Sequence, residues 1–365
     1  MWLYNLYYRA EGTGIMSKNW IFWLEELGQD HNDIVGRKCA NLGEMTKMNL
    51  PVPPGFALCV EAYQDFMKMT GVANEIRECI SLAEGISKEQ AKFSELSTRI
   101  RHVIHSKVMP EEMEETILTY YHELCQRSKK PDVAVSVRSA GPMSHPGQYE
   151  TYLNIIGESE ILDKVKKVWA STFNPRSLAF RSRKGMPLDT DPIGVAVLKM
   201  VNARAAGVIF TADPNTGDTS RMIIEANWGL GESVVNGEST PDIYIVNKDS
   251  LEVEEKTLGP KCRCVIPSEA GVIEVATPPD KVSAFCLSDK EVKAVAKFGK
   301  ILEDHFSAPQ DIEWAIDQDA MSPDNVVLLQ TRPEIIAQKK TSIDQITDLM
   351  INRLSGGLGF KQDGI

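Results

Sequence analysis

The sequence predicts an α+β protein of two lobes, and two patterns along the chain support this prediction. Before Ile193 most of the chain consists of amphipathic stretches with apolar residues at helical spacing. From Ile193 onward, short apolar runs alternate with clusters of Gly, Asn and Pro, which is typical of strands and turns. Runs of helices followed by runs of strands are characteristic of the α+β class. The change of pattern places the lobe boundary near residues 191–201.

The individual elements follow from the same patterns. Gly36-Arg37-Lys38 is expected as a loop that leads into the first helix, and the prolines before Gly55 end that helix. Arg138-Ser139-Ala140-Gly141 is expected as a polar turn after a strand. The expected helices span residues 38–48, 60–69, 89–107, 111–128 and 289–306. The expected strands span residues 133–137, 194–199, 207–211, 222–226 and 242–246, followed by a hairpin.

Four segments are expected along the chain: an N-terminal extension at 1–15, an N-terminal lobe at 16–198, a C-terminal lobe at 199–338 and a tail at 339–365. The extension is aromatic, but Asn5, Arg9 and Glu11 interrupt it, so it lacks the apolar run of a signal peptide. The tail combines a helix with a Gly-rich end. It is either a flexible tether or a frayed terminus.

The composition limits the possible partners and compartments. A net charge of −11 and a pI near 5.2 argue against nucleic acid as a partner, because binding its backbone requires clustered Lys and Arg. Seven cysteines are an odd number, which indicates reduced thiols and a cytoplasmic protein. No stretch has the length and apolarity of a membrane span, so membrane attachment is not expected.

The hairpin near the C-terminus carries alternating acidic and apolar residues. In residues 310–316, period two places Asp311 and Glu313 on one face, opposite the face of Ile312 and Trp314. A turn centred between Met321 and Ser322 makes residues face each other when their numbers sum to 643. This register pairs Asp311 with Arg332, Glu313 with Gln330, Ile312 with Thr331 and Trp314 with Leu329.

One face of the hairpin would therefore hold two carboxylates, an amide oxygen and a guanidinium. Oxygen ligands such as those of Asp311, Glu313 and Gln330 suit Mg²⁺, which takes a few carboxylates together with phosphate oxygens and water. The alternative is a solvated strand face with an ordinary surface salt bridge, since any half-exposed strand alternates in this way.

Two upstream cations are candidates for binding phosphate. Lys38 and Arg138 each stand near a glycine in an expected loop, where side chains and backbone N–H groups could meet a polyphosphate. The segment from Ser144 to Thr151 has the small, turn-forming residues of a lid over phosphates. The alternative for Lys38 is an ordinary surface lysine.

Taken together, these segments resemble the nucleotide-binding domain shared by phosphoenolpyruvate synthase, pyruvate phosphate dikinase and rifampicin phosphotransferase. The resemblance runs from about Asp33 to Glu334. The motifs that carry it, in chain order, are Val35-Gly36-Arg37-Lys38-Cys39-Ala40-Asn41-Leu42-Gly43-Glu44, Ser136-Val137-Arg138-Ser139, Gly207-Val208-Ile209-Phe210-Thr211-Ala212-Asp213-Pro214, Trp228-Gly229-Leu230-Gly231-Glu232 with Thr240-Pro241-Asp242, Asp311-Ile312-Glu313-Trp314, and Gln330-Thr331-Arg332-Pro333-Glu334.

The resemblance implies an ATP-grasp fold with the nucleotide in the cleft between the lobes, and ATP and Mg²⁺ as cofactors. It also implies a role for each motif residue. Arg332, Arg138 and Lys38 would be catalytic, with Arg332 stabilising the phosphoryl group in flight, and the metal would bind Glu313 and Gln330 with Asp311 nearby. The nucleotide would contact Lys38, Arg138, the lid residues Gly147, Gln148, Tyr149 and Thr151, the hinge residues Lys199, Met200 and Val201, and Glu313 and Gln330.

Relatives of this kind also carry a phosphorylatable histidine in a Thr-Ser-His-Ala setting, and none of the six histidines here has that setting. We therefore expect a separate ATP-binding subunit, resembling that of phenylphosphate synthase. It would pass the β-phosphoryl group of ATP to a histidine on a partner that also holds the acceptor site, giving AMP and phosphate. The alternatives are a non-catalytic regulatory module and a stand-alone small-molecule phosphotransferase. The final acceptor stays open.

Overall fold

The computed structural model describes residues 19–82, 90–141, 149–237, 239–269, 271–321 and 324–334. The chain forms two compact units, and it changes unit after Glu44, after Pro53 and after Lys199. Unit 1 holds the residues up to Glu44 and those from Pro54 to Lys199, and unit 2 holds Met45–Pro53 and the residues from Met200 onward. Across the described residues, no helix combines the length and apolarity needed to cross a membrane.

Unit 1 is built on an antiparallel five-stranded sheet in the order β1-β2-β5-β3-β4. Its strands are β1 Ile21–Trp23, β2 Gly55–Leu58, β3 Val135–Ala140, β4 Thr151–Ile155 and β5 Gly194–Lys199. Its helices are η1 Leu24–Glu26, η2 Gln29–His31, α1 Asn32–Val35, α2 Arg37–Lys47, α3 Val60–Met69, α4 Val72–Leu82, α5 Gln90–Ser106, α6 Glu111–Ser128, α7 Glu158–Ala170, η3 Ser171–Phe173 and α8 Pro175–Lys184. The residues of α2 from Met45 onward belong to unit 2.

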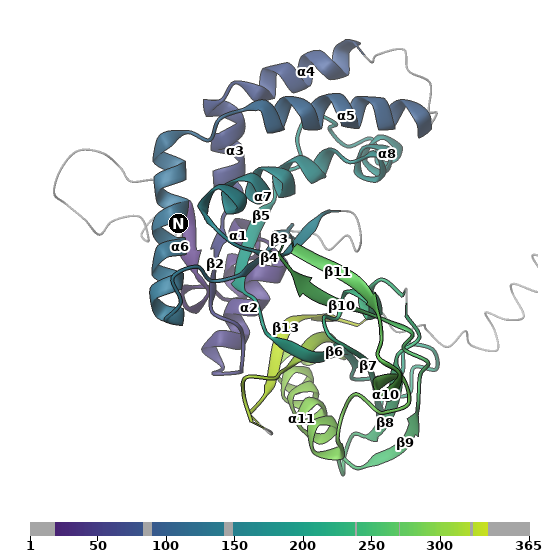
Figure 1. The fold of residues 1–365 in the computed structure, drawn as a ribbon. Coiled ribbons are helices and arrows are strands. Elements are labelled where there is room, and N and C mark those ends of the chain that lie inside the picture. The colour runs from purple at the N-terminus through teal and green to yellow at the C-terminus, as the bar shows by residue number, and fades with distance from the viewer. Residues whose placement is uncertain are drawn as a thin grey trace, which may run out of the picture. The chain divides into compact units, whose positions relative to one another are not determined.

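The helices of unit 1 pack through apolar stripes. In α3 the buried side chains include Tyr63 and Phe66, which lie on one helical face. Both contact Trp169 of α7, with ring centroids 6.3 Å and 5.0 Å away, respectively. Helix α5 packs against α4, α7 and α8 (Figure 1). These contacts bury large aromatic groups, which contribute strongly to core stability.

Unit 2 is built on an antiparallel six-stranded sheet in the order β13-β12-β6-β7-β8-β9, with a separate ribbon of β10 and β11. Its strands are β6 Ala203–Phe210, β7 Arg221–Trp228, β8 Asp242–Asn247, β9 Val253–Thr257, β10 Arg263–Ser268, β11 Gly271–Ala276, β12 Gln310–Asp317 and β13 Val326–Pro333. Its helices are α9 Glu232–Val235, α10 Pro279–Val282 and α11 Asp289–Phe306.

Helix α11 covers one face of the large sheet of unit 2 (Figure 1). A capping box between Ser288 and Glu291 satisfies backbone N–H groups and explains why the helix begins at Asp289. The helix ends where Ser307 adopts a left-handed conformation with φ of 53°. The sheet face under α11 is therefore the core of this unit.

The α+β prediction is confirmed, because helices accompany two antiparallel sheets. The predicted bounds of α3, α6, α11 and β5 match the structure. The predicted turn at Arg138 is wrong, since β3 continues to Ala140 by pairing with β5 as far as Gly194. Several elements were not predicted, among them α1, α4, α7, α8, α9, α10, β2, β4, β9, β10 and β11.

Candidate functional site

In unit 1 the start of α2 lies against the end of β3. Gly36 has a positive φ of 82°, and a Cβ on it would come within 2.0 Å of the carbonyl oxygen of Ala140. The backbone N–H of Arg37 donates to the carbonyl of Gly141 over 3.1 Å. Only glycine fits this approach without strain, so Gly36 joins two motifs that are far apart in the sequence.

This approach brings Lys38 and Arg138 into one neighbourhood. Lys38 lies in the first turn of α2, as the predicted helix over 38–48 implies, rather than in the loop before it. Arg138 lies in β3 and not in the predicted turn. Both side chains lower the pKa of the buried Cys39 thiol, although burial outweighs them and raises that pKa to about 12. Thr151 of β4 is the direct partner of Arg138 across the sheet. A local cationic region in unit 1 follows from this placement.

The other predicted contacts of unit 1 are spread more widely. Gly147 and Gln148 lie outside the described residues. The hydroxyl of Tyr149 donates to Asp191 Oδ2 over 2.8 Å, and burial together with Asp191 raises the pKa of this tyrosine. This bond ties the chain just before β4 to the segment before β5.

The hinge residues follow the last strand of unit 1. Lys199 ends β5 opposite Val135, three residues from Arg138 along β3, so its side chain projects from the other face of the sheet. Met200 and Val201 come next, at the point where the chain enters unit 2. The structure therefore groups Lys38, Arg138 and Thr151 but does not place Lys199 on their face.

In unit 2 the hairpin of β12 and β13 has the predicted register along its outer half. Asp311 faces Arg332, Ile312 faces Thr331 and Glu313 faces Gln330. The predicted pairing of Trp314 with Leu329 is wrong, because a bulge after Glu313 shifts the register and Trp314 faces Leu328. A bulge inserts one unpaired residue into one strand, so the polar pairs are kept while the apolar pairs shift by one.

Asp311 and Arg332 form a close ion pair at the open end of this hairpin. Asp311 Oδ2 lies 2.6 Å from Arg332 Nη2 and 2.8 Å from Arg332 Nε. Burial raises the pKa of Asp311 and Glu313 raises it further, although Arg332 opposes both effects. The carboxylates around Arg332 therefore remain incompletely compensated, which favours an additional cation.

Glu313 and Gln330 face each other beside this pair. Glu313 is half-buried and Gln330 is buried. Within the described ranges, the side chains of His, Cys, Asp and Glu form no cluster of three or more suited to holding a metal ion. Mg²⁺ does not require such a cluster, since one or two carboxylates and phosphate oxygens suffice. The donors of Glu313, Gln330 and Asp311 fit that requirement.

Sequence reasoning missed two carboxylates near Asp311. Asp311 raises the pKa of Glu225 in β7 and that of Glu334 after β13. Burial is the largest cause in both cases, and it brings the pKa of Glu334 to about 7. The signal for Glu225 was an acidic residue inside the apolar run of β7. Glu334 ends the motif that begins at Gln330, but the sequence did not predict that it lies near Asp311.

The strand ends around the hairpin are fastened by side chains. The backbone N–H of Gln310 donates to Thr211 Oγ1 over 2.8 Å, and the backbone N–H of Thr211 donates to the carbonyl of Gln310 over 2.9 Å. The backbone N–H of Ala212 donates to Glu334 Oε2 over 3.2 Å. These bonds hold β6, β12 and β13 in register next to Asp311 and Arg332.

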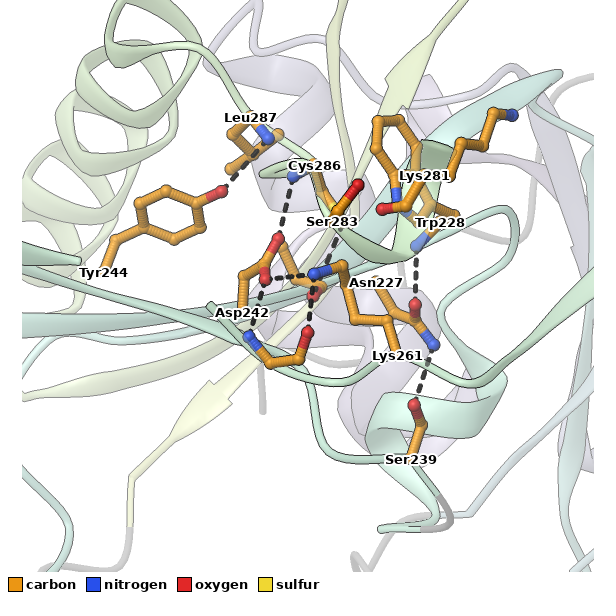
Figure 2. A network of polar contacts seen from close by, with 12 residues as sticks. Asn227, Trp228, Ser239, Asp242, Tyr244, Lys261, Lys281, Ser283, Cys286 and Leu287 are labelled. Atoms are coloured by element: carbon orange, nitrogen blue, oxygen red, sulfur yellow. Dashed lines mark hydrogen bonds and ion pairs between the residues drawn. The ribbon is translucent and has the colours of Figure 1, made fainter. Parts of the chain in front are cut away.

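The motif at Asp242 serves a structural network (Figure 2). Lys261 Nζ lies 2.5 Å from Asp242 Oδ1, and both side chains are fully buried. The other carboxylate oxygen accepts the backbone N–H of Cys286 over 2.8 Å. Close by, Asn227 donates to Ser239 Oγ over 3.0 Å (Figure 2). Because every charge is paired and hydrogen-bonded, this network anchors the loops after β9 and before α11 to β8.

Comparison with known proteins identifies the family. Residues 32–353 match the family described as pyruvate phosphate dikinase, AMP/ATP-binding domain. The chain belongs to this family. The resemblance inferred from the motifs is thereby confirmed, and the Lys38 and Arg332 motifs both lie within the matched part.

Relatives of this dikinase domain family include three archaeal proteins. A probable phosphoenolpyruvate synthase of Staphylothermus marinus is 37% identical and matches 87% of this chain. The phosphoenolpyruvate synthase of Aeropyrum pernix is 37% identical over 89% of this chain, and a probable one of Methanothermobacter thermautotrophicus is 38% identical over 90%. The matches cover 42%, 43% and 48% of these relatives, respectively, so this chain spans less than half of their length.

Proposed function

We propose that the chain is the ATP-binding, phosphoryl-donating component of a dikinase-type phosphotransferase. The observation that carries the proposal is the hairpin of β12 and β13, where Glu313 faces Gln330 and Arg332 is held by Asp311. It occurs in a chain of the AMP/ATP-binding domain family, whose relatives are named as phosphoenolpyruvate synthases.

The proposal gives each group of residues a separate role in binding or transfer. Lys38 and Arg138 bind the phosphates of ATP from unit 1, together with the lid from Ser144 to Thr151. Glu313 and Gln330 bind Mg²⁺, which would neutralise charge on the phosphates. Arg332 stabilises the charge that develops on the transferred phosphoryl group.

The arrangement proposed for these residues is the ATP-grasp fold, in which both lobes contribute to one nucleotide site. Its support is the complementary chemistry of the units: cations in unit 1, and carboxylates with an amide oxygen in unit 2. The hinge residues Lys199, Met200 and Val201 would contact the adenine. A cytoplasmic location is proposed because all seven cysteines are unpaired thiols, as a reducing compartment would keep them.

The acceptor of the phosphoryl group is proposed to be a histidine on a separate partner subunit. None of the six histidines stands in the Thr-Ser-His-Ala setting of a carrier. The partner would form a phosphohistidine from the β-phosphoryl group of ATP and hold the final acceptor. In-line transfer requires its nitrogen to reach within about 3–3.5 Å of the phosphorus.

Radiolabelled ATP tests this proposal. The purified chain is incubated with Mg²⁺ and [β-³²P]ATP, with and without a partner that carries the histidine. The expected result is nucleotide binding with negligible turnover by the chain alone, and AMP with labelled partner when both are present. Stable label on a histidine of this chain would refute the partner requirement, and failure to bind Mg²⁺-ATP would refute the proposed function.

A further inference from the structure

Glu225 is a carboxylate that the proposed function does not use. It lies in β7, where it pairs with Val208 of β6 on one side and Ile243 of β8 on the other. Val208 pairs in turn with Glu313, and Glu313 pairs with Gln330. Directly paired residues project from the same face of a sheet. Glu225 therefore shares a face with the proposed metal ligands Glu313 and Gln330.

The described residues around Glu225 supply neither a hydrogen-bond donor nor a cation to its carboxylate. The side chain is half-buried, and within the described residues it has no hydrogen bond or ion pair. Burial and Asp311 both raise its pKa, with no cation acting against them. A partly desolvated carboxylate without a donor costs free energy, and a ligand that donates hydrogen bonds would remove that cost.

Apolar side chains adjoin Glu225 on the same face. Phe210 pairs with Ile223, and Ile223 pairs with Ile245, one row further along the strands. All three are only half-buried, whereas residues of the opposite face such as Ile224 and Tyr244 are fully buried. The open face of β6, β7 and β8 thus offers an apolar surface with one strong hydrogen-bond acceptor.

Glu225 is also kept in place by close backbone packing. Gly207 of β6 approaches so tightly that a Cβ on it would lie 1.8 Å from the carbonyl oxygen of Glu225. Neighbouring strands are about 4.8 Å apart, so the backbones of Glu225 and Glu313 are separated by about 10 Å. The carboxylate of Glu225 is therefore close enough to meet the sugar of a nucleotide whose phosphates lie at β12 and β13.

From this geometry we propose that Glu225 accepts hydrogen bonds from the ribose hydroxyls of the bound nucleotide. Unit 2 would then distinguish ribonucleotides from nucleotides whose sugar lacks those hydroxyls. This inference rests on the proposed ATP-binding function. Two hydroxyl donors directed at the carboxylate would stabilise its ionised form in the complex.

Calorimetric titration of the full chain with Mg²⁺-ATP and with Mg²⁺-2′,3′-dideoxyATP tests the proposal. The unsubstituted chain should bind ATP about 10- to 100-fold more tightly than the dideoxy analogue, as expected for hydrogen bonds to a charged acceptor. Glu225→Ala should reduce ATP affinity to the level of the analogue and leave the analogue unaffected. Glu255→Ala is the matched control, since Glu255 is an exposed carboxylate on β9 of the same sheet.

Thermal unfolding without nucleotide supplies a second measurement. Glu225→Gln should melt no lower than the unsubstituted chain, because it removes a charge that Asp311 opposes. A clear loss of stability in Glu225→Gln would indicate a structural role and overturn the proposal.

The binding outcomes separate the remaining possibilities. Equal weakening of ATP and dideoxyATP by Glu225→Ala would overturn the ribose contact. Weakening of inorganic tripolyphosphate binding that depends on Mg²⁺ would assign Glu225 to the metal and also overturn it. If the unsubstituted chain bound both nucleotides equally, the ribose contact would fail while the proposed function stood. Absence of ATP binding would refute both.

Discussion

The two units carry opposite charges at their candidate sites. In unit 1, Lys38 and Arg138 both act on the buried Cys39, and the region is cationic. In unit 2, Asp311 raises the pKa of Glu225 and Glu334, so the carboxylates there destabilise one another's charge. In the proposed function, a polyphosphate would therefore bind the residues of unit 1 directly. The residues of unit 2 would need a cation between themselves and the phosphates.

The contacts that position the charged side chains also differ between the two units. In unit 1, a close backbone approach at Gly36 brings the helix of Lys38 against the strand of Arg138. Arg332 in unit 2 is held by a carboxylate oxygen at 2.6 Å, within a hairpin whose strand ends are fastened by Thr211 and Glu334. Unit 1 should therefore be sensitive to backbone changes, and unit 2 to changes of charge and of metal.

Arg332→Ala is expected to have the largest effect. Phosphoryl transfer to the histidine partner should fall about 10²- to 10³-fold, as removal of one donor to a transition-state charge typically causes. ATP affinity should change little, because the charge of Arg332 matters most during transfer. Single-turnover kinetics beside calorimetric titration would measure both quantities.

Arg221→Ala is the control for this variant, since Arg221 is an exposed arginine on β7 of the same sheet. Unchanged transfer by Arg332→Ala would remove Arg332 from the mechanism.

Gly36→Ala should break the cationic region by displacing α2 from β3. The added Cβ meets a backbone oxygen at 2.0 Å and the φ of 82° is unfavourable. We expect a loss of about 3 kcal/mol in the free energy of unfolding, together with weaker nucleotide binding. Urea denaturation would measure the loss.

Gly71→Ala separates the two causes. Gly71 has a similar φ of 72°, but a Cβ on it meets nothing within 4 Å. It should cost only about 1 kcal/mol from the backbone conformation. Equal losses for the two variants would show that the contact of Gly36 with Ala140 is not what matters.

Glu313→Gln tests whether unit 2 binds the nucleotide through a metal ion. The affinity for Mg²⁺-ATP should fall about tenfold, because an amide supplies no charge to a divalent ion. The affinity for ATP without metal should stay within about twofold. Lys38→Met, in contrast, should weaken both forms. If Glu313→Gln weakened both forms equally, the residue would be structural rather than a metal ligand.

The smallest expected effect concerns Glu334 and pH. Its folded pKa is raised from 4.5 to about 7, so the folded state binds a proton that the unfolded state has released between these values. Stability from this group is therefore complete below pH 4.5 and declines as the pH rises to about 7. Since the side chain is partly exposed, we expect a decline of only about 1 kcal/mol.

Glu334→Gln should remove this part of the pH dependence. Chemical denaturation at pH 5 and pH 8 would show a smaller difference in unfolding free energy for the variant than for the unsubstituted chain. An unchanged difference would mean that Glu334 titrates normally in the folded protein.

The sequence by itself determined the features that depend on local spacing. Period two in β12 predicted that Asp311 and Glu313 share a face, and the summed register predicted their partners Arg332 and Gln330. The apolar spacing of residues 60–69 and 289–306 predicted the bounds of α3 and α11. These features are accessible because side-chain direction and helix capping depend on residues only a few positions apart.

Only the tertiary structure decided the features that depend on distant partners. Arg138 continues β3 because β5 supplies its pairing, and the bulge after Glu313 shifts Trp314 to Leu328. Glu225 joins the polar face through pairings that run across β6 to β12. Strand order and close backbone approach are set by packing between segments far apart in the chain, which no local pattern encodes.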